Sequence, residues 1–122
     1  MILSDHNVRV WLCLQATDMR KSFRGLIGLV KRHLSEDPLS GHLFVFINKR
    51  KTYMKILYHA DGGFCIWMKK LTQGQFAFAE SNRVKRSMSW QALQCLIDGI
   101  EFEKVSYRKR YRYETQSARI PV

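Results

Sequence analysis

The residues best suited to chemistry are cations and tyrosines that alternate close to the C-terminus. The tyrosines are Tyr107, Tyr111 and Tyr113, and the cations among them are Arg108, Lys109, Arg110 and Arg112. Cationic side chains neutralise phosphates and aromatic rings stack on bases, so this combination is typical of nucleic-acid contact. The alternative interpretation is a solvated tail that only aids solubility. We favour nucleic-acid contact because the whole chain is strongly basic.

Further cations gather in short groups at predicted turns and strand ends. These groups are Lys49-Arg50-Lys51, Lys69-Lys70 and the run at 83–86. A basic turn at the tip of a two-stranded ribbon fits the major groove of DNA, although an ordinary exposed hairpin turn has the same composition. Between residues 38 and 79, Asp61 is the only acidic residue that opposes the cations. We therefore expect an electropositive sheet region.

An enzyme would need a cluster of titratable groups, and the sequence offers little of one. The carboxylates that could form a two-metal nuclease site are Asp18, Asp61 and Asp98, but each has a local role in capping a helix, shaping a turn or ending a helix. The histidines do not pair with cysteines at zinc-ligand spacing, and no glycine-rich loop lies between a strand and a helix. We expect no catalysis, no metal and no cofactor. A nuclease would require these three carboxylates to lie close together.

Length and charge narrow the class of protein. A chain of 122 residues, 46% of them hydrophobic, suffices for one domain, and a formal charge of +11 calls for a polyanionic partner. The N-terminus lacks the regions of a signal peptide, and no apolar run approaches the length of a membrane span. Cys13, Cys65 and Cys95 lie far apart in apolar sequence, as reduced thiols do. We expect a soluble, cytoplasmic protein that does not bind membranes.

The apolar pattern predicts the elements that position the first group of cations. A strand is expected over residues 8–14. Thr17 or Asp18 would then cap a long helix whose apolar face runs from Met19 to Leu34. This helix must bury its apolar face against the rest of the protein.

The outer side of this predicted helix is cationic. It would carry Arg20, Lys21 and Arg24. Gly25 and Gly28 weaken the helix locally, and we expect them to let it lie close against a sheet.

From residue 43 the apolar pattern changes to a period of two. The expected strands are 43–48, 53–59, 64–71 and 75–79. Turns rich in Asn, Asp and Gly separate them, so the predicted fold is α+β, with an antiparallel β-meander sheet packed against the long N-terminal helix. Both faces of the strands are apolar, so the second face needs a cover.

A basic linker, 81–87, leads from the meander to a second, short C-terminal helix. Ser89 is expected to cap this helix, and Gly99 to end it. We predict a single α+β domain over residues 1–103, followed by a basic, Tyr/Arg-rich C-terminal arm over residues 104–122.

Several of these segments, in this order, resemble a known family. They are Asp18-Met-Arg-Lys-Ser-Phe with Gly25-Leu26, Pro38-Leu-Ser-Gly41, Phe44-Val-Phe-Ile-Asn-Lys-Arg-Lys51, Lys55-Ile-Leu57, Gly62-Gly-Phe64, and Lys69-Lys-Leu71 with Gly74 and Phe76. Over about residues 8 to 100 they look like the TnpB-type accessory proteins of the bacterial insertion sequence sixty-six family. The resemblance implies a protein that assists a separate transposase without itself cutting DNA.

The chain departs from the family pattern at a few positions. Lys70 and Thr72 stand where the family usually has Arg and Glu, and His59 stands where Trp is common. Lys70 keeps the positive charge but lacks the planar fork with which Arg grips phosphate.

Our leading hypothesis is a non-catalytic transposition accessory protein that binds DNA through its phosphate backbone. The predicted DNA contacts are Arg20, Lys21, Arg24, Lys49, Arg50, Lys51, Lys69, Lys70, Arg108, Lys109, Arg110 and Arg112. The alternative is an adaptor that binds the transposase, or a second copy of itself, through an apolar sheet face. The expected partners are therefore DNA and the transposase of the same element.

Overall fold

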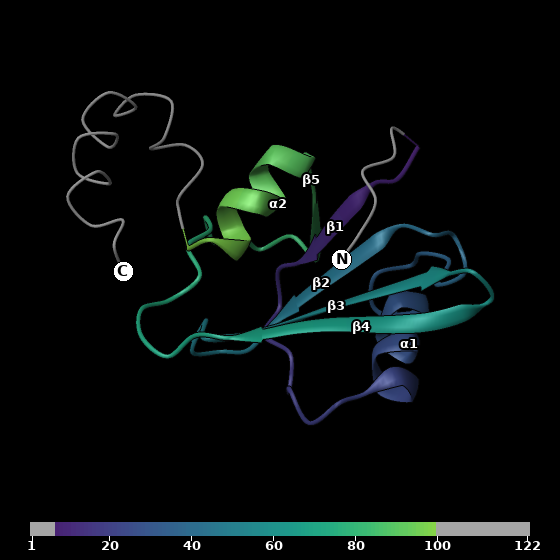
Figure 1. The fold of residues 1–122 in the computed structure, drawn as a ribbon, viewed down its shortest axis with the longest axis horizontal. Helices are drawn as coiled ribbons and strands as arrows, with labels where there is room; N and C mark the ends of the chain where they lie inside the picture. Colours follow the sequence, from purple (N-terminus) through teal and green to yellow (C-terminus); the bar gives the residue numbers. More distant parts are fainter. Residues whose placement is uncertain (1–6, 100–122) are drawn as a thin grey trace.

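The computed structural model describes residues 7–99, which form a five-stranded sheet with one helix against each face (Figure 1). The strands are β1 (Val10–Cys13), β2 (Leu43–Ile47), β3 (Tyr53–Ala60), β4 (Gly63–Lys70) and β5 (Lys85–Met88), and the helices are α1 (Phe23–Arg32) and α2 (Trp90–Ile97). Across the sheet the strands lie in the order β4-β3-β2-β1-β5. The predicted α+β class is confirmed.

The first three elements form a parallel crossover, β1-α1-β2. Val10 of β1 pairs with Leu43 of β2, and the two strands run in the same direction. A parallel pair needs a long connection, which α1 and its flanking loops supply. The sheet is therefore mixed, and the prediction of an antiparallel meander was wrong for the sheet as a whole. Only β2, β3 and β4 follow one another in antiparallel order among the described strands.

The prediction of a long first helix was also wrong, because α1 has 10 residues and begins after Ser22. The backbone N–H of Thr17 donates to the carbonyl of Ile47 at 2.9 Å, so this bond holds Thr17 at the end of β2. The carboxylate of Asp18 accepts a hydrogen bond from the backbone N–H of Arg20 at 2.9 Å. The two residues expected to cap the helix therefore build the loop before it.

The glycines of α1 make room for cationic side chains instead of bringing the helix closer to the sheet. A Cβ atom at Gly28 would lie 2.3 Å from a guanidinium nitrogen of Arg32, and one at Gly25 would lie 3.1 Å from Cβ of Lys21. Both nearest neighbours are side chains of the same segment, so our interpretation of these glycines was wrong.

Tight turns join β2 to β3 and β3 to β4, as predicted. The side-chain oxygen of Asn48 accepts hydrogen bonds from the backbone N–H groups of Thr52 at 2.9 Å and Tyr53 at 3.1 Å, which fixes the first turn. Asp61 and Gly62 have φ values of 52° and 81°, as in the two-residue turn that suits a right-twisted hairpin. Local turn chemistry therefore determines these two hairpins.

The fifth strand lies elsewhere than predicted. Residues 75–79 form no strand, and within them Phe76 is 1% exposed and donates its N–H to the carbonyl of Lys51 at 2.7 Å. The segment predicted as a basic linker instead forms β5, antiparallel to β1, with Lys85 opposite Cys13. Backbone pairing satisfies the second edge of β1 whatever the side chains, and charged residues are usual on an edge strand.

One face of the sheet packs against α1. The buried residues of this layer are Cys13, Leu26, Val30, Leu34, Phe44, Phe46 and Leu57. They come from β1, β2 and β3 on one side and from α1 and the residues after it on the other.

The other face packs against α2 and the segment that follows β4. Its buried residues are Val10, Leu12, Leu43, Val45, Ile47, Met54, Ile56, Phe76, Leu93, Leu96 and Ile97. The cover predicted for the second face is therefore α2 together with Phe76. As predicted, Ser89 caps α2 by accepting a hydrogen bond from the N–H of Ala92 at 3.0 Å, and Gly99 follows the helix with φ 76°.

The structure also bears on the predicted state of the cysteines and on possible membrane spans. The cysteines Cys13, Cys65 and Cys95 are all free, and burial raises the pKa of the Cys13 thiol. Neither helix within residues 7–99 has the length and apolar character that a membrane span requires.

Candidate nucleic-acid interface

Strand direction brings many cations to one end of the sheet, which we call the basic end. β1, β2 and β4 finish there, and β3 and β5 begin there, because Tyr53 pairs with Lys70 and Cys13 pairs with Lys85. The loops, turns and strand ends at the basic end carry the cations Arg20, Lys21, Lys49, Arg50, Lys51, Lys69, Lys70, Arg83 and Lys85 and the carboxylates Asp18, Glu80 and Asp98. The loops at the opposite end carry Arg9, Glu36, Asp37 and Asp61. In the loops, cations therefore outnumber carboxylates at the basic end only, although α1 carries Lys31 and Arg32 in its last turn, away from that end.

The β2–β3 turn presents two of its three cations to solvent. Lys49 and Arg50 are exposed, and the side chain of neither has a partner among residues 7–99. Lys51 differs, because its ammonium lies 3.0 Å from a carboxylate oxygen of Glu80 and 4.6 Å from the ring centroid of Phe78. Lys49 and Arg50 are therefore the free cations of this turn.

The loop before α1 holds one exposed ion pair. The guanidinium of Arg20 donates to the carboxylate of Asp18, with a shortest distance of 2.6 Å, and this hydrogen bonding lowers the pKa of Asp18 to about 2. The side chain of Arg20 is 92% exposed, so the pair contributes little to folding and its guanidinium can also reach a phosphate. Lys21 and Arg24 are exposed too, and Arg24 is the second residue of α1, directly after this loop.

The two lysines that end β4 point to opposite faces of the sheet. Lys69 donates from its ammonium to the carbonyl of Ile97 at 2.8 Å, so it caps the C-terminus of α2. Lys70 is exposed, with its ammonium 5.8 Å from the ring centroid of Tyr53. Only Lys70 of this pair is free to contact a ligand.

Two further lysines, which were not predicted as functional, hold α1 on the sheet. Lys55 is 7% exposed and donates to the carbonyls of Met19 at 2.7 Å and Lys21 at 2.8 Å, just before the helix. Lys85 donates to the carbonyl of Leu34 at 2.7 Å and pairs with the carboxylate of Glu36, just after the helix. These cations are structural.

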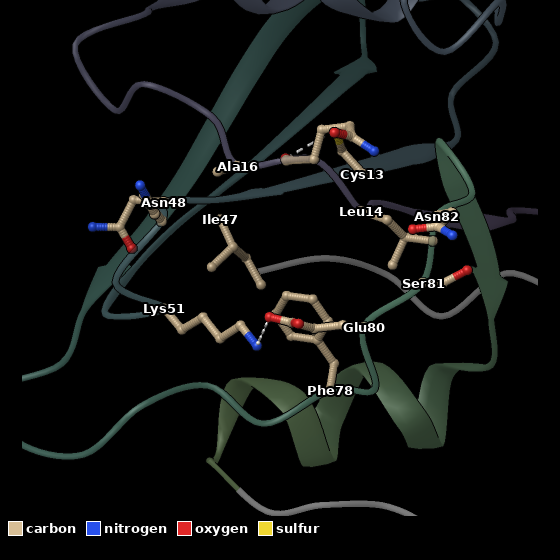
Figure 2. A pocket seen from close by; sticks show the side chains of 12 residues that line it. Cys13, Leu14, Ala16, Ile47, Asn48, Lys51, Phe78, Glu80, Ser81 and Asn82 are labelled. Atoms are coloured by element: carbon tan, nitrogen blue, oxygen red, sulfur yellow. Dashed lines mark hydrogen bonds and ion pairs between the residues drawn. The ribbon is translucent and has the colours of Figure 1, made fainter.

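A pocket of ≈ 590 Å³ opens at the basic end, where the carboxyl ends of the parallel strands β1 and β2 meet the segment that leads to β5 (Figure 2). Figure 2 shows the side chains of Lys51 and Glu80 pointing toward each other, beside the ring of Phe78. A hollow of ≈ 340 Å³ also has Asn48 and Lys49 in its lining and extends to Arg50. Lys49 therefore borders both depressions.

The three carboxylates of the nuclease alternative lie in three unconnected settings. Asp18 pairs with Arg20 in the loop before α1, Asp61 forms the β3–β4 turn at the opposite end of the sheet, and Asp98 is the C-cap of α2. Within the described ranges no three His, Cys, Asp or Glu side chains form a group that could hold a metal ion. The three carboxylates therefore do not come together as the nuclease alternative requires.

The predicted DNA contacts fall into three groups in the structure. The structure gathers Arg20, Lys21, Lys49, Arg50, Lys51, Lys69 and Lys70 at the basic end. Arg24 lies next to this group, in the first turn of α1, and Arg108, Lys109, Arg110 and Arg112 lie outside the described residues. The contacts of Glu80 and Phe78 with Lys51 were missed, and no spacing in the sequence signals them.

The sequence matches one protein family and two curated proteins. The family model described as "IS66 Orf2 like protein" matches residues 8–107. Two uncharacterized proteins of Sinorhizobium fredii are similar: y4hO is 33% identical over 84% of this chain and 89% of its own length, and y4jC is 30% identical over 97% of this chain and 100% of its own length. No solved structure matches the chain significantly.

Proposed function

The chain belongs to the IS66 Orf2-like family, and we propose that it serves this transposition system by binding DNA. Family membership implies an accessory role in transposition, and the DNA contact is our inference from the charges of the molecule. The observation that carries it is the set of unpaired cations at the basic end. Lys49, Arg50 and Lys70 are exposed there. Of the three carboxylates at this end, Asp18 and Glu80 are already paired with a cation, and exposed Asp98 accepts from the side-chain amide of Gln94.

The contacts we propose are made to phosphates. Lys49 and Arg50 project from a tight turn, and Lys70 lies at the end of an adjacent hairpin, so the three side chains come from a rigid sheet. Lysine binds phosphate as a point charge and arginine as a planar fork, and neither contact depends on base sequence. Binding of this kind positions a protein on DNA and weakens steeply as salt rises.

The test is the binding of the full chain to duplex DNA across a salt series. Removing one cation that neutralises a phosphate lowers the slope of log K against log salt by about 0.9, so the double variant K49A/R50A should have a slope smaller by about 2. Lys31→Ala is the matched control, because Lys31 is an exposed cation of α1, away from the basic end, with no partner in the described chain. It should change the slope little.

Two results would end this proposal. One is wild-type protein that does not bind duplex DNA at low salt, and the other is a K31A variant whose slope falls as much as that of K49A/R50A. A chain that ends at residue 103 tests separately the contribution of the predicted arm and its cations, Arg108, Lys109, Arg110 and Arg112.

The adaptor alternative depends on an apolar sheet face that is open to a partner. Within residues 7–99 one face is covered by α1 and the other by α2 with Phe76, so the faces themselves offer little surface. Binding to the transposase stays a prediction, and co-purification of the two proteins would test it.

A further inference from the structure

The two edges of the sheet differ in a way that bears on self-association. β5 forms one edge, and it is only 4 residues long and carries Lys85 and Arg86. β4 forms the other edge, is 8 residues long and has no charged residue before Lys69. Natural sheets usually protect an edge by making it short, charged or bulged. β5 is protected in this way and β4 is not.

The hydrogen-bonding pattern shows which backbone groups of β4 face outward. The N–H of Leu71 donates to the carbonyl of Thr52 at 2.7 Å, which identifies this opposed pair as hydrogen-bonded. Hydrogen-bonded pairs alternate along antiparallel strands, so Lys69, Trp67, Cys65 and Gly63 bond to β3. The outward groups are those of the alternate residues, which are Phe64, Ile66, Met68 and Lys70.

We propose that β4 pairs antiparallel with β4 of a second copy of this chain. In the register that uses the whole edge, Ile66 of each copy lies opposite Met68 of the other, and Phe64 lies opposite Lys70. The two Trp67 residues then face each other at the two-fold axis. The contact is the same from both sides, as a symmetric dimer requires.

The charges of the strand favour this arrangement over its alternatives. Antiparallel pairing places Lys69 and Lys70 of each copy beside the β3–β4 turn of the other, where Asp61 is an exposed carboxylate. Parallel pairing would set the lysines of both copies side by side, which is unfavourable. A second copy therefore complements the β4 edge in both register and charge.

Side chains along the edge add apolar contact to the backbone pairing. Met68 is 51% exposed, and Phe64, Ile66 and Trp67 are half-buried in the single chain. Cross-strand pairs of aromatic and aliphatic residues stabilise a sheet. Pairing would also join two sheets into one and leave the basic end of each copy uncovered, at opposite ends of the new central pair.

The first test is the oligomeric state of the full chain without DNA, measured by sedimentation over a concentration series. Met68→Pro removes an N–H that faces outward, so it costs no bond to β3, and Met68→Thr is the matched control that keeps the N–H. We expect a dimer for wild type and M68T, and a dissociation constant raised about tenfold or more for M68P. A monomeric wild type, or equal dimerisation of M68P and M68T, would overturn the proposal.

The second test fixes the register. Opposed residues of a non-hydrogen-bonded pair have Cα atoms about 4.5 Å apart, which a disulfide can bridge. Trp67→Cys in a Cys65→Ser background should therefore cross-link two copies under mild oxidation. A dimer that persists without this cross-link would overturn the register. Both tests omit DNA, so their failure would leave the proposed DNA binding untouched.

Discussion

Replacing Lys55 by methionine would remove the ammonium that holds the loop before α1 while keeping a side chain of similar length. Lys55 lies in β3, is 7% exposed, and donates to the carbonyls of Met19 and Lys21 at 2.7 and 2.8 Å. Methionine cannot donate to either carbonyl. The loop before the helix would therefore lose these two hydrogen bonds to the sheet, while the apolar face of α1 stays packed.

The magnitude follows from these two bonds. Hydrogen bonds to a charged donor contribute roughly 1.5–3 kcal/mol each, and a carbonyl left without a partner costs more where water cannot reach it. Part of this loss is recovered, because the loop lies at the surface and because methionine removes the cost of burying a charge. We expect the free energy of unfolding to fall by about 2–3 kcal/mol, a large part of the stability of a domain this size.

Urea unfolding followed by tryptophan fluorescence measures this change. Lys49→Met is the matched control, because Lys49 undergoes the same substitution at an exposed site and should change the free energy of unfolding by less than about 0.5 kcal/mol. In DNA binding the order should be reversed: K49M should lower the slope of log K against log salt, and K55M should leave it unchanged. A K55M protein as stable as wild type, or one with a reduced salt slope, would refute the structural role of Lys55.

Two further predictions concern the loop before α1 and the cover of the second face. Hydrogen bonding to Arg20 lowers the pKa of Asp18 to about 2, so the pair adds a little stability at a pH above the ordinary pKa of 3.8, and this stability is lost as the pH falls toward 2. In the variant Arg20→Gln, NMR titration should show the pKa of Asp18 returning toward 3.8, and an unchanged pKa would count against the pair. Phe76→Ala should lower the free energy of unfolding by about 3–5 kcal/mol, because Phe76 is 1% exposed. Thr72→Ala, at an exposed position, is the control and should change it little, so equal urea midpoints for the two variants would contradict the packing of Phe76.

Local signals in the sequence were sufficient for the parts of the fold that local chemistry determines. Asn48, Asp61 and Gly62 form turns because of their own side chains or their tolerance of positive φ, so the two hairpins were predictable. Ser89 likewise caps α2 through a bond to a residue three positions on. In each case a few neighbouring residues decide the conformation.

The errors arose where distant parts of the chain decide the conformation. β5 forms because its backbone pairs with the second edge of β1, and nothing in the basic sequence of β5 itself indicates a strand. Thr17 and Asp18 have the side chains of helix caps, but the sheet binds the backbone of Thr17, and the helix starts later. Pattern and propensity are weak where such tertiary contacts compete with them.

For the candidate site, too, local sequence signals predicted exposure but not the contacts with distant residues. Charge and turn position were enough to identify Lys49, Arg50 and Lys70 as exposed cations. They could not separate these from Lys69, whose ammonium bonds to the carbonyl of Ile97. Lys55 did carry a readable signal, since it stands on the same strand face as buried Leu57, where an unpaired ammonium would be unfavourable.

The pairing of β1 with β5 has a consequence for synthesis on the ribosome. β1 is made first, but the strand that completes its outer edge follows more than half the described chain later. Until residues 85–88 have left the exit tunnel, the nascent chain carries β1 with one row of backbone groups unpaired. A nascent chain stalled before residue 85 should therefore be a substrate for proteases and chaperones, and release past that point should end this vulnerability.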